Sequence, residues 1–408
     1  MALIAQAQTA PEARVASVQV KGTRRYAPEQ VTRLSGIEIG KPASVEKLTA
    51  AANRLAATGL FDSVRFTYTT GPGQMTVTFD VEEAKWTVPV ILDNFVWLAD
   101  EQLIAAVAEE MPSFDGTAPV NTGAAEFLTQ ALQKVLKARG IPGRVDFSLQ
   151  AAFNATSTAP RYLFAVKEPA PAVCALHAAG ASAIPERELI GQLGTIVGGS
   201  YSRHFLSTAA QGTLTDMYRR KGFWRAEFSP PAAALDGCQG VSVTLTVKEG
   251  AAYAWDHAEW SGTSVLAAEL LNKAIGMKEG DTADATKIEA GLRDVHDAYA
   301  KQGYITERST HQPRLDDAAH RAVFAITVDE GPQFHMGTLE FIGIREEDAA
   351  MLARKWRLKP GDVYDDAYAR KYQFEEILPL KTQSGARPRV ETQLDRDKHL
   401  VNLRIVFK

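Results

Sequence analysis

The sequence lacks several features that mark large classes of proteins. It holds only two cysteines in 408 residues, Cys174 and Cys238, and they form no zinc-binding pattern. No apolar run reaches the roughly 18 to 20 residues that a membrane-spanning helix needs. Basic and acidic residues nearly balance, 45 against 49, so no positive excess supports nucleic-acid binding. We therefore expect neither a membrane helix nor a nucleic-acid partner.

Sequence patterns of catalysis are also missing. The eight histidines are dispersed, and none stands in the H-E-x-x-H spacing of a zinc protease. No phosphate-binding loop occurs, and Gly-x-Ser appears only outside the strand–turn–helix setting of a nucleophile elbow. We therefore expect no enzymatic activity and no cofactor.

What the sequence does contain is a repeated junction between a helix and a strand. A helical pattern with basic residues in its last turn ends at a glycine, and strand-forming residues follow it. Glycine suits this place because it takes the left-handed conformation that closes a helix. The junction glycines are Gly59, Gly140, Gly222, Gly303 and, in a weaker form, Gly385. Their intervals are 81, 82, 81 and 82 residues, and so steady a period indicates an internal repeat.

Two further landmarks keep the same period. The first predicted strand of a repeat ends in glycine at Gly22, Gly180, Gly262 and Gly343. The last predicted strand ends in a valine with a glutamate two residues later, at Val81, Val166, Val247 and Val328. These valines are 85, 81 and 81 residues apart. Three landmarks in register are a much stronger signal than any one of them.

Within each period the patterns predict the order strand, helix, helix, strand, strand. The predicted fold is α+β, with five tandem β-α-α-β-β units in an elongated array, each packing two helices on a three-stranded mixed sheet. The first and third strands of a unit should run parallel and the second antiparallel, because directions alternate along a compact chain. The predicted units are residues 14–85, 86–171, 172–251, 252–333 and 334–408. Residues 1–13 are expected to be a disordered tail or a signal-peptide remnant.

The units resemble POTRA (polypeptide-transport-associated) domains. The resemblance rests on the strand-end glycines, the helix pair, exits such as Thr58-Gly59-Leu60-Phe61, and final strands that end in Val-x-Glu-Gly. The array is similar to the periplasmic region of the BamA family of outer-membrane-protein assembly factors, in which a membrane β-barrel follows. This sequence stops at the fifth repeat, so a region cut from a longer protein and a POTRA-only protein both stay open. The resemblance implies a periplasmic, outer-membrane-associated location.

The resemblance also implies that the second strand of a unit lies at a free sheet edge. Unpaired N–H and C=O groups there can take up another chain by strand addition, which reads backbone and so accepts many unfolded clients. The predicted contact residues are Val64, Arg65, Phe66, Thr67, Trp224, Arg225, Ala226, Glu227, Phe228, Ile305, Thr306 and Glu307. Charges within these stretches also fit the opposite interpretation, in which the edges are blunted against association.

The two cysteines fall in one repeat. Cys174 begins its first predicted strand and Cys238 precedes its third, so parallel neighbouring strands would bring both to the same end of the sheet. In the oxidising compartment that the resemblance implies, we predict a disulfide between them; two packed thiols are the alternative. Mass measurement after thiol alkylation, with and without reduction, separates the two.

The expected function is protein binding in the assembly or insertion of outer-membrane β-barrel proteins. The expected partners are unfolded outer-membrane proteins or envelope assembly proteins. A POTRA-only scaffold that bridges envelope proteins is the alternative within this class. An enzyme carried on a repeat frame is the alternative from another class, and it would need histidines and carboxylates gathered from several repeats.

Overall fold

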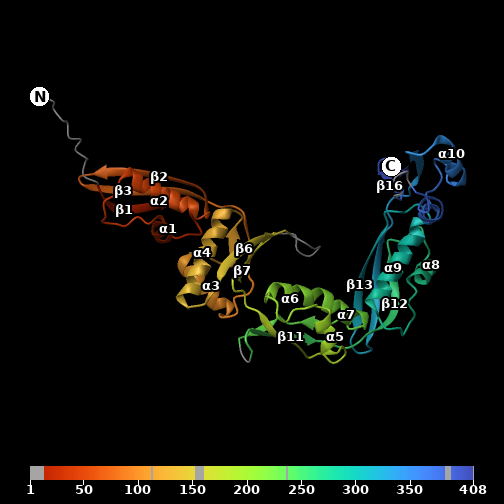
Figure 1. Ribbon diagram of the computed structural model, residues 1–408, viewed down its shortest axis with the longest axis horizontal. Coiled ribbons are helices and arrows are strands. Elements are labelled where there is room, and N and C mark those ends of the chain that lie inside the picture. Colours follow the sequence, from red (N-terminus) through yellow and green to blue (C-terminus); the bar gives the residue numbers. More distant parts are fainter. Residues whose placement is uncertain (1–12, 112–113, 152–159, 236–237, 382–386, 408) are drawn as a thin grey trace. The chain divides into compact units, whose positions relative to one another are not determined.

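The computed structural model describes residues 13–111, 114–151, 160–235, 238–381 and 387–407 (Figure 1). The predicted tail lies outside these ranges apart from its last residue, and Gly385 also lies outside them. Within them the strands form five mixed sheets, and each sheet draws its strands from one predicted repeat. The predicted α+β class is confirmed.

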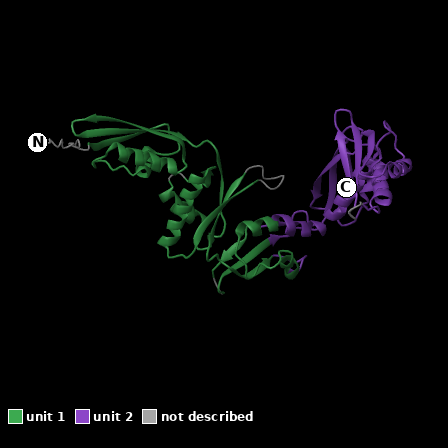
Figure 2. Cartoon of the chain, turned by 45° about the horizontal axis from the view of Figure 1, so that its top comes forward, with its two compact units in different colours: residues 1–179, 186–210, 230–246 green, residues 180–185, 211–229, 247–408 purple. Residues whose placement is uncertain are grey.

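The chain divides into two compact units (Figure 2). The first comprises residues 1–179, 186–210 and 230–246, and the second comprises residues 180–185, 211–229 and 247–408. The division passes through the third repeat, whose strand β8 belongs to the first unit and whose helix α7 belongs to the second.

The first repeat has the predicted order of elements. They are β1 Arg14–Lys21, α1 Pro28–Ser35, α2 Val45–Ala57, β2 Phe61–Gly71 and β3 Gln74–Glu83. Helix α2 begins after Ser44, whose hydroxyl accepts a hydrogen bond from the N–H of Lys47 at 3.3 Å. The sheet order is β1-β3-β2, with β1 parallel and β2 antiparallel to β3, as predicted. Leu48, Leu55 and Phe79 are fully buried between helix and sheet, each contributing roughly 1.5–3 kcal/mol.

The second repeat carries one strand more than predicted. Its elements are β4 Thr87–Leu92, α3 Asp100–Glu110, β5 Thr117–Pro119, α4 Thr122–Ala138, β6 Arg144–Gln150 and β7 Arg161–Lys167. The short strand β5 pairs antiparallel with β4, which makes the sheet four-stranded in the order β5-β4-β7-β6. The prediction of three strands was therefore wrong here, since three residues are too few for a periodic signal. Phe79 and Phe164 belong to one continuous core that spans the first two repeats.

The third repeat also departs from three strands. Its elements are β8 Val173–Ala179, α5 Glu186–Gly191, α6 Arg203–Ala209, the π-helical segment η1 Ala210–Leu214, α7 Thr215–Arg220, β9 Glu227–Phe228, β10 Ala232–Ala234 and β11 Val241–Lys248. The sheet order is β10-β11-β8, and β9 pairs with the end of β11. The predicted second strand, residues 224–228, is thus replaced by two short strands, and Pro230 and Pro231 lie between them.

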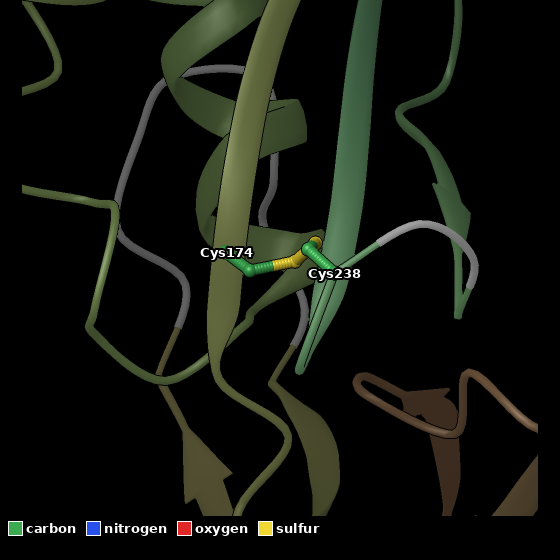
Figure 3. Close-up of a disulfide and its surroundings, with 2 residues drawn as sticks. All are labelled: Cys174 and Cys238. Atoms are coloured by element: carbon green, nitrogen blue, oxygen red, sulfur yellow. A yellow bond between two sulfur atoms is a disulfide. The ribbon is translucent and has the colours of Figure 1, made fainter.

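A disulfide joins Cys174 to Cys238 in this repeat (Figure 3). Strands β8 and β11 run parallel, and Val173 pairs with Val241 at the end where both cysteines lie. The Cα atoms of the two cysteines are 6.1 Å apart, within the usual range for a disulfide. The bond ties the chain before β11 to the first strand of its own sheet.

The fourth and fifth repeats keep the predicted topology. The fourth consists of β12 Ala254–Ser261, α8 Ala268–Ile275, α9 Ala285–Ala300, β13 Arg308–Asp316 and β14 Arg321–Asp329. The fifth consists of β15 His335–Ile342, α10 Glu346–Lys355, α11 Asp366–Tyr372, the π-helical segment η2 Gln373–Ile377, β16 Arg389–Asp395 and β17 Leu400–Val406. The sheet orders are β12-β14-β13 and β15-β17-β16, each with a parallel and an antiparallel pair.

The strand-end glycine and the Val-x-Glu motif prove to be parts of one structure. In the fourth repeat Gly262 has a φ of +73°, and a Cβ atom there would lie 2.2 Å from the carbonyl oxygen of Val328. Glu330, two residues after Val328, accepts hydrogen bonds from the N–H groups of Ser264 and Val265, both at 2.8 Å. The carboxylate thereby closes the loop that begins at Gly262. Glu83 and Glu249 accept equivalent bonds in the first and third repeats.

This arrangement predicts an acid-sensitive contribution to stability. Burial acts to raise the pKa of Glu330, but hydrogen bonds from Ser264, Val265 and Tyr299 outweigh it and lower the pKa from 4.5 to about 2. A lowered folded-state pKa stabilises the fold above pH 4.5, and this contribution is lost as the pH falls from 4.5 towards 2. Glu330→Gln should cost about 1–2 kcal/mol at neutral pH and reduce the loss of stability over that window.

Native-state hydrogen exchange of the β14 amides, measured across that window, tests this expectation. Glu126→Gln is the control, since Glu126 is exposed on α4 and forms no ion pair with any described residue. Equal exchange in Glu330→Gln and the control at neutral pH would contradict the assigned role.

Candidate protein-binding site

Strand β2 is a long, open sheet edge. It pairs on one side with β3, in a register that runs from Phe61 opposite Glu83 to Gly71 opposite Gln74. No strand in the described part of the chain pairs with its other side. In an antiparallel pair the backbone groups of alternate residues face away from the partner. Strand β2 lies at the edge of its sheet (Figure 1). It therefore presents a row of unpaired N–H and C=O groups.

The side chains of β2 leave this edge accessible. Val64 and Phe66 are half-buried against the core, whereas Arg65 and Thr67 are exposed. Tyr68 is 42% exposed, so an aromatic surface lies beside the open backbone. Between Val64 and the end of the strand the only charged residue is Arg65, and there is no proline. This edge thus carries few of the devices that protect sheet edges from association.

Strands β13 and β16, at the corresponding edges of the fourth and fifth repeats, are better protected. Strand β13 pairs only with β14, and Pro313 in its middle lacks an N–H donor. Arg314 and Asp316 add charges to the same strand. Strand β16 begins with an ion pair between Arg389 and Glu391. Strands β13 and β16 therefore fit the interpretation in which the edge is blunted against association. Strand β2 fits the interpretation in which the edge is open to strand addition.

The predicted edge at residues 224–228 is largely wrong as secondary structure. Only Glu227 and Phe228 form a strand, and Trp224, Arg225 and Ala226 lie in the turn before it. Phe228 is buried and pairs with Val247. Trp224 does not extend the strand, because its side chain packs against the core of the fourth repeat.

Trp224 inserts into the fourth repeat. Its indole N–H donates a hydrogen bond to the carbonyl oxygen of Ala283 at 2.7 Å. Its ring centroid lies 5.2 Å from that of Phe324 in an edge-to-face arrangement. Two residues earlier, the carbonyl of Gly222 accepts the N–H of Tyr253 at 2.9 Å. The junction glycine therefore binds the backbone of the next repeat, and the side chain of Trp224 packs against the core of that repeat.

The junction at Gly303 repeats this arrangement. The carbonyl of Gly303 accepts the N–H of Phe334 at 2.8 Å, and Ile305 packs into the core of the fifth repeat. Ile305, Thr306 and Glu307 precede β13 instead of belonging to it, so the predicted strand here begins too early. Glu307 is buried and cannot contact a client.

The side chain of Glu307 is held inside its own repeat. It accepts a hydrogen bond from the hydroxyl of Ser309 at 2.5 Å, and its other oxygen lies 2.9 Å from Nδ1 of His296. These contacts satisfy a carboxylate that would otherwise be buried without partners. At the first junction Asn121 plays the docking role, donating from Nδ2 to the carbonyl of Gly59 at 2.9 Å.

Sequence patterns could have revealed the docking role. Tyr253 and Phe334 each lie 31 residues after a junction glycine, Gly222 and Gly303 respectively. An aromatic residue at one fixed offset from a glycine in two repeats indicates a contact specific to those junctions. The predicted edge residues that do lie on an open strand are those of β2.

The described residues show no metal centre and no membrane helix. No group of three or more histidine, cysteine or acidic side chains in the described ranges is placed to hold a metal ion. None of the helices in that part of the chain is both long and apolar enough to cross a bilayer.

A tandem array of α+β modules with an open edge strand is the class that this fold defines. The profile of the POTRA family, described as "Surface antigen variable number repeat", matches residues 13–84 and 253–331. The chain therefore contains POTRA domains at these two places.

The chain is also similar to individual proteins. It is 29% identical over 161 residues to a protein of Treponema pallidum (strain Nichols) named "Putative outer membrane protein assembly factor". The match covers 38% of this chain and 19% of that relative, so the chain spans about a fifth of the relative's length.

Two solved structures are similar at low identity. The POTRA3-5 fragment of Haemophilus influenzae BamA is 17% identical, with a TM-score of 0.44, covering 59% of this chain and 96% of that one. The N-terminal domain of Omp85 from Thermosynechococcus elongatus is 21% identical, with a TM-score of 0.27, covering 59% of this chain and 98% of that one.

Proposed function

We propose that this chain is a periplasmic, outer-membrane-associated protein-binding array that takes part in the assembly of outer-membrane β-barrel proteins. It binds unfolded outer-membrane proteins or envelope assembly proteins, and it does so without catalysis or a cofactor. The POTRA domains at residues 13–84 and 253–331 and the named relative support the process. The open edge of β2 supports the mode of binding.

Strand addition to β2 is the proposed mechanism. An extended client segment forms main-chain hydrogen bonds with the outward N–H and C=O groups of β2 and extends the sheet. Alternate client side chains then fall on the helix side of the sheet, beside Phe66, and on its open side, beside Thr67. Because the backbone supplies most of the contacts, clients of different sequence are accepted.

Adjacent proline substitutions test this mechanism. Thr67 and Tyr68 are neighbours on β2, so the N–H of one faces β3 and that of the other faces outward. Proline in place of the residue whose N–H faces outward should leave the unfolding temperature nearly unchanged, because no ladder bond is lost. It should reduce client capture at least tenfold. Proline at the inward position should cost about 1–3 kcal/mol of stability through the lost ladder bond. Capture is measured by crosslinking to a urea-denatured outer-membrane β-barrel protein after dilution.

Strand β16 provides the matched control. Thr392→Pro alters another sheet edge, whose charged residues protect it already. This variant should capture the client as the unaltered chain does. If neither proline in β2 reduces capture while the fold is kept, binding does not proceed through this edge.

A further inference from the structure

A carboxylate of the chain itself forms an ion pair at the junction of the third and fourth repeats. Nε and Nη2 of Arg225 donate to the two carboxylate oxygens of Asp317 at 2.8 and 2.9 Å. The hydroxyl of Tyr253 also donates to Asp317 and accepts from Nε of Arg225 at 3.0 Å. This bidentate arrangement is strong and directional. A turn of the fourth repeat is thereby fastened to the chain that leaves the third.

The next junction has different side chains at the equivalent positions. Arg225 and Thr306 are both the third residue after a junction glycine, and Tyr253 and Phe334 are both the thirty-first. Asp317 is replaced by Arg396, since each follows the last residue of an edge strand and lies three residues before a histidine with positive φ. The arginine, the tyrosine hydroxyl and the aspartate are thus all missing here.

A cavity of about 530 Å³ stands at this second junction. It is lined by Thr306, Arg308, Asp329, Phe334 and Arg396, among others. Neither Arg308 nor Arg396 forms an ion pair with any described residue. The hydroxyl oxygen of Thr306 is buried and has no hydrogen-bond partner there. The cavity therefore combines two arginines that form no ion pair in the described residues with an unsatisfied hydroxyl group.

The charged side chains of the lining are two arginines and two carboxylates. Asp329 lies opposite Arg308 in the register of β13 and β14, and its carboxylate accepts a hydrogen bond from the N–H of Gly331 at 3.3 Å. Glu307 also borders the cavity, but its carboxylate is engaged by His296 and Ser309. Both lining carboxylates thus have partners, whereas Arg396 forms no ion pair with a described residue and the Thr306 hydroxyl has no hydrogen-bond partner there.

We propose that this cavity binds a carboxylate side chain from an acidic segment of a partner protein. The preceding junction indicates the chemistry that fits, since an arginine and a hydroxyl group there hold the carboxylate of Asp317. Here Arg308, Arg396 and the Thr306 hydroxyl supply the donors, and the carboxylate comes from outside. The site is separate from β2, so its success or failure does not decide strand addition.

The test uses a capped tetraglutamate peptide and the isotope-labelled full chain. Amide resonances of Thr306, Gly331 and Arg396 should shift on titration, while a capped tetraglutamine peptide should leave them in place. The double variant R308Q/R396Q should weaken tetraglutamate binding at least tenfold. R354Q is the control, because Arg354 is exposed on α10 and forms no ion pair with a described residue. Its affinity should match that of the unaltered chain.

A second double variant keeps the proposal falsifiable. Thr306→Arg with Arg396→Asp rebuilds the internal pair of the preceding junction and should abolish peptide binding while the fold is retained. Unchanged tetraglutamate affinity in R308Q/R396Q would overturn the proposal. Inorganic phosphate that shifts the same resonances as strongly, at equal concentration and ionic strength, would overturn the assignment to a carboxylate.

Discussion

Trp224→Ala is expected to separate the fourth repeat from the third. The substitution removes the ring that packs on Phe324 and the donor to the carbonyl of Ala283. Aromatic-to-alanine changes in cores cost about 3–5 kcal/mol, and the partial exposure of Trp224 places the expected loss at about 2–4 kcal/mol. Native-state hydrogen exchange of the β14 amides should report this loss as faster opening.

Trp86→Ala is the matched control for this experiment. Trp86 is 81% exposed, so its removal should change stability by less than about 0.5 kcal/mol. A Trp224→Ala chain that exchanges as slowly as the control would show that the indole does not hold the junction together.

Gly262→Ala is expected to disrupt the fourth repeat more severely. The φ of +73° costs an L-residue about 1–2 kcal/mol, and the new Cβ would lie 2.2 Å from the carbonyl oxygen of Val328. Backbone must move to relieve that contact, which separates β12 from β14 at the loop that Glu330 closes. The expected loss is about 4 kcal/mol or more, the range of a major core disruption.

Gly280→Ala separates the two causes. Gly280 has a φ of +87°, but no atom lies within 4 Å of the position of an added Cβ. This variant should therefore lose only the conformational penalty of about 1–2 kcal/mol. Thermal unfolding of both variants, with hydrogen exchange to locate the change, measures the difference. Equal losses would mean that the contact with Val328 has no role.

Much of the architecture could be predicted from periodicity alone. The glycine period places the five sheets, and alternating strands give the parallel and antiparallel pairs of β1, β2 and β3. The short strands β5, β9 and β10 could not be predicted, because two or three residues carry no periodic signal.

The candidate site was predictable only where local pattern and tertiary packing agree. The residues of β2 alternate and pack within one repeat, so their pattern identifies both the strand and its faces. Trp224 and Ile305 have strong strand propensity, yet each packs into the following repeat. The strand propensity of a residue reflects its preference for a half-buried surface, and it does not identify the repeat that provides this surface.

The most direct test of strand addition is hydrogen exchange of β2 in the presence of a bound client. A urea-denatured outer-membrane β-barrel protein is diluted into the full chain, and exchange is followed along Phe61–Gly71 and Gln74–Glu83. Strand addition predicts that alternate amides of β2 become at least tenfold more protected, while those of β3, already paired on both sides, change little. A captured client that leaves every β2 amide exchanging at its original rate would contradict the mechanism.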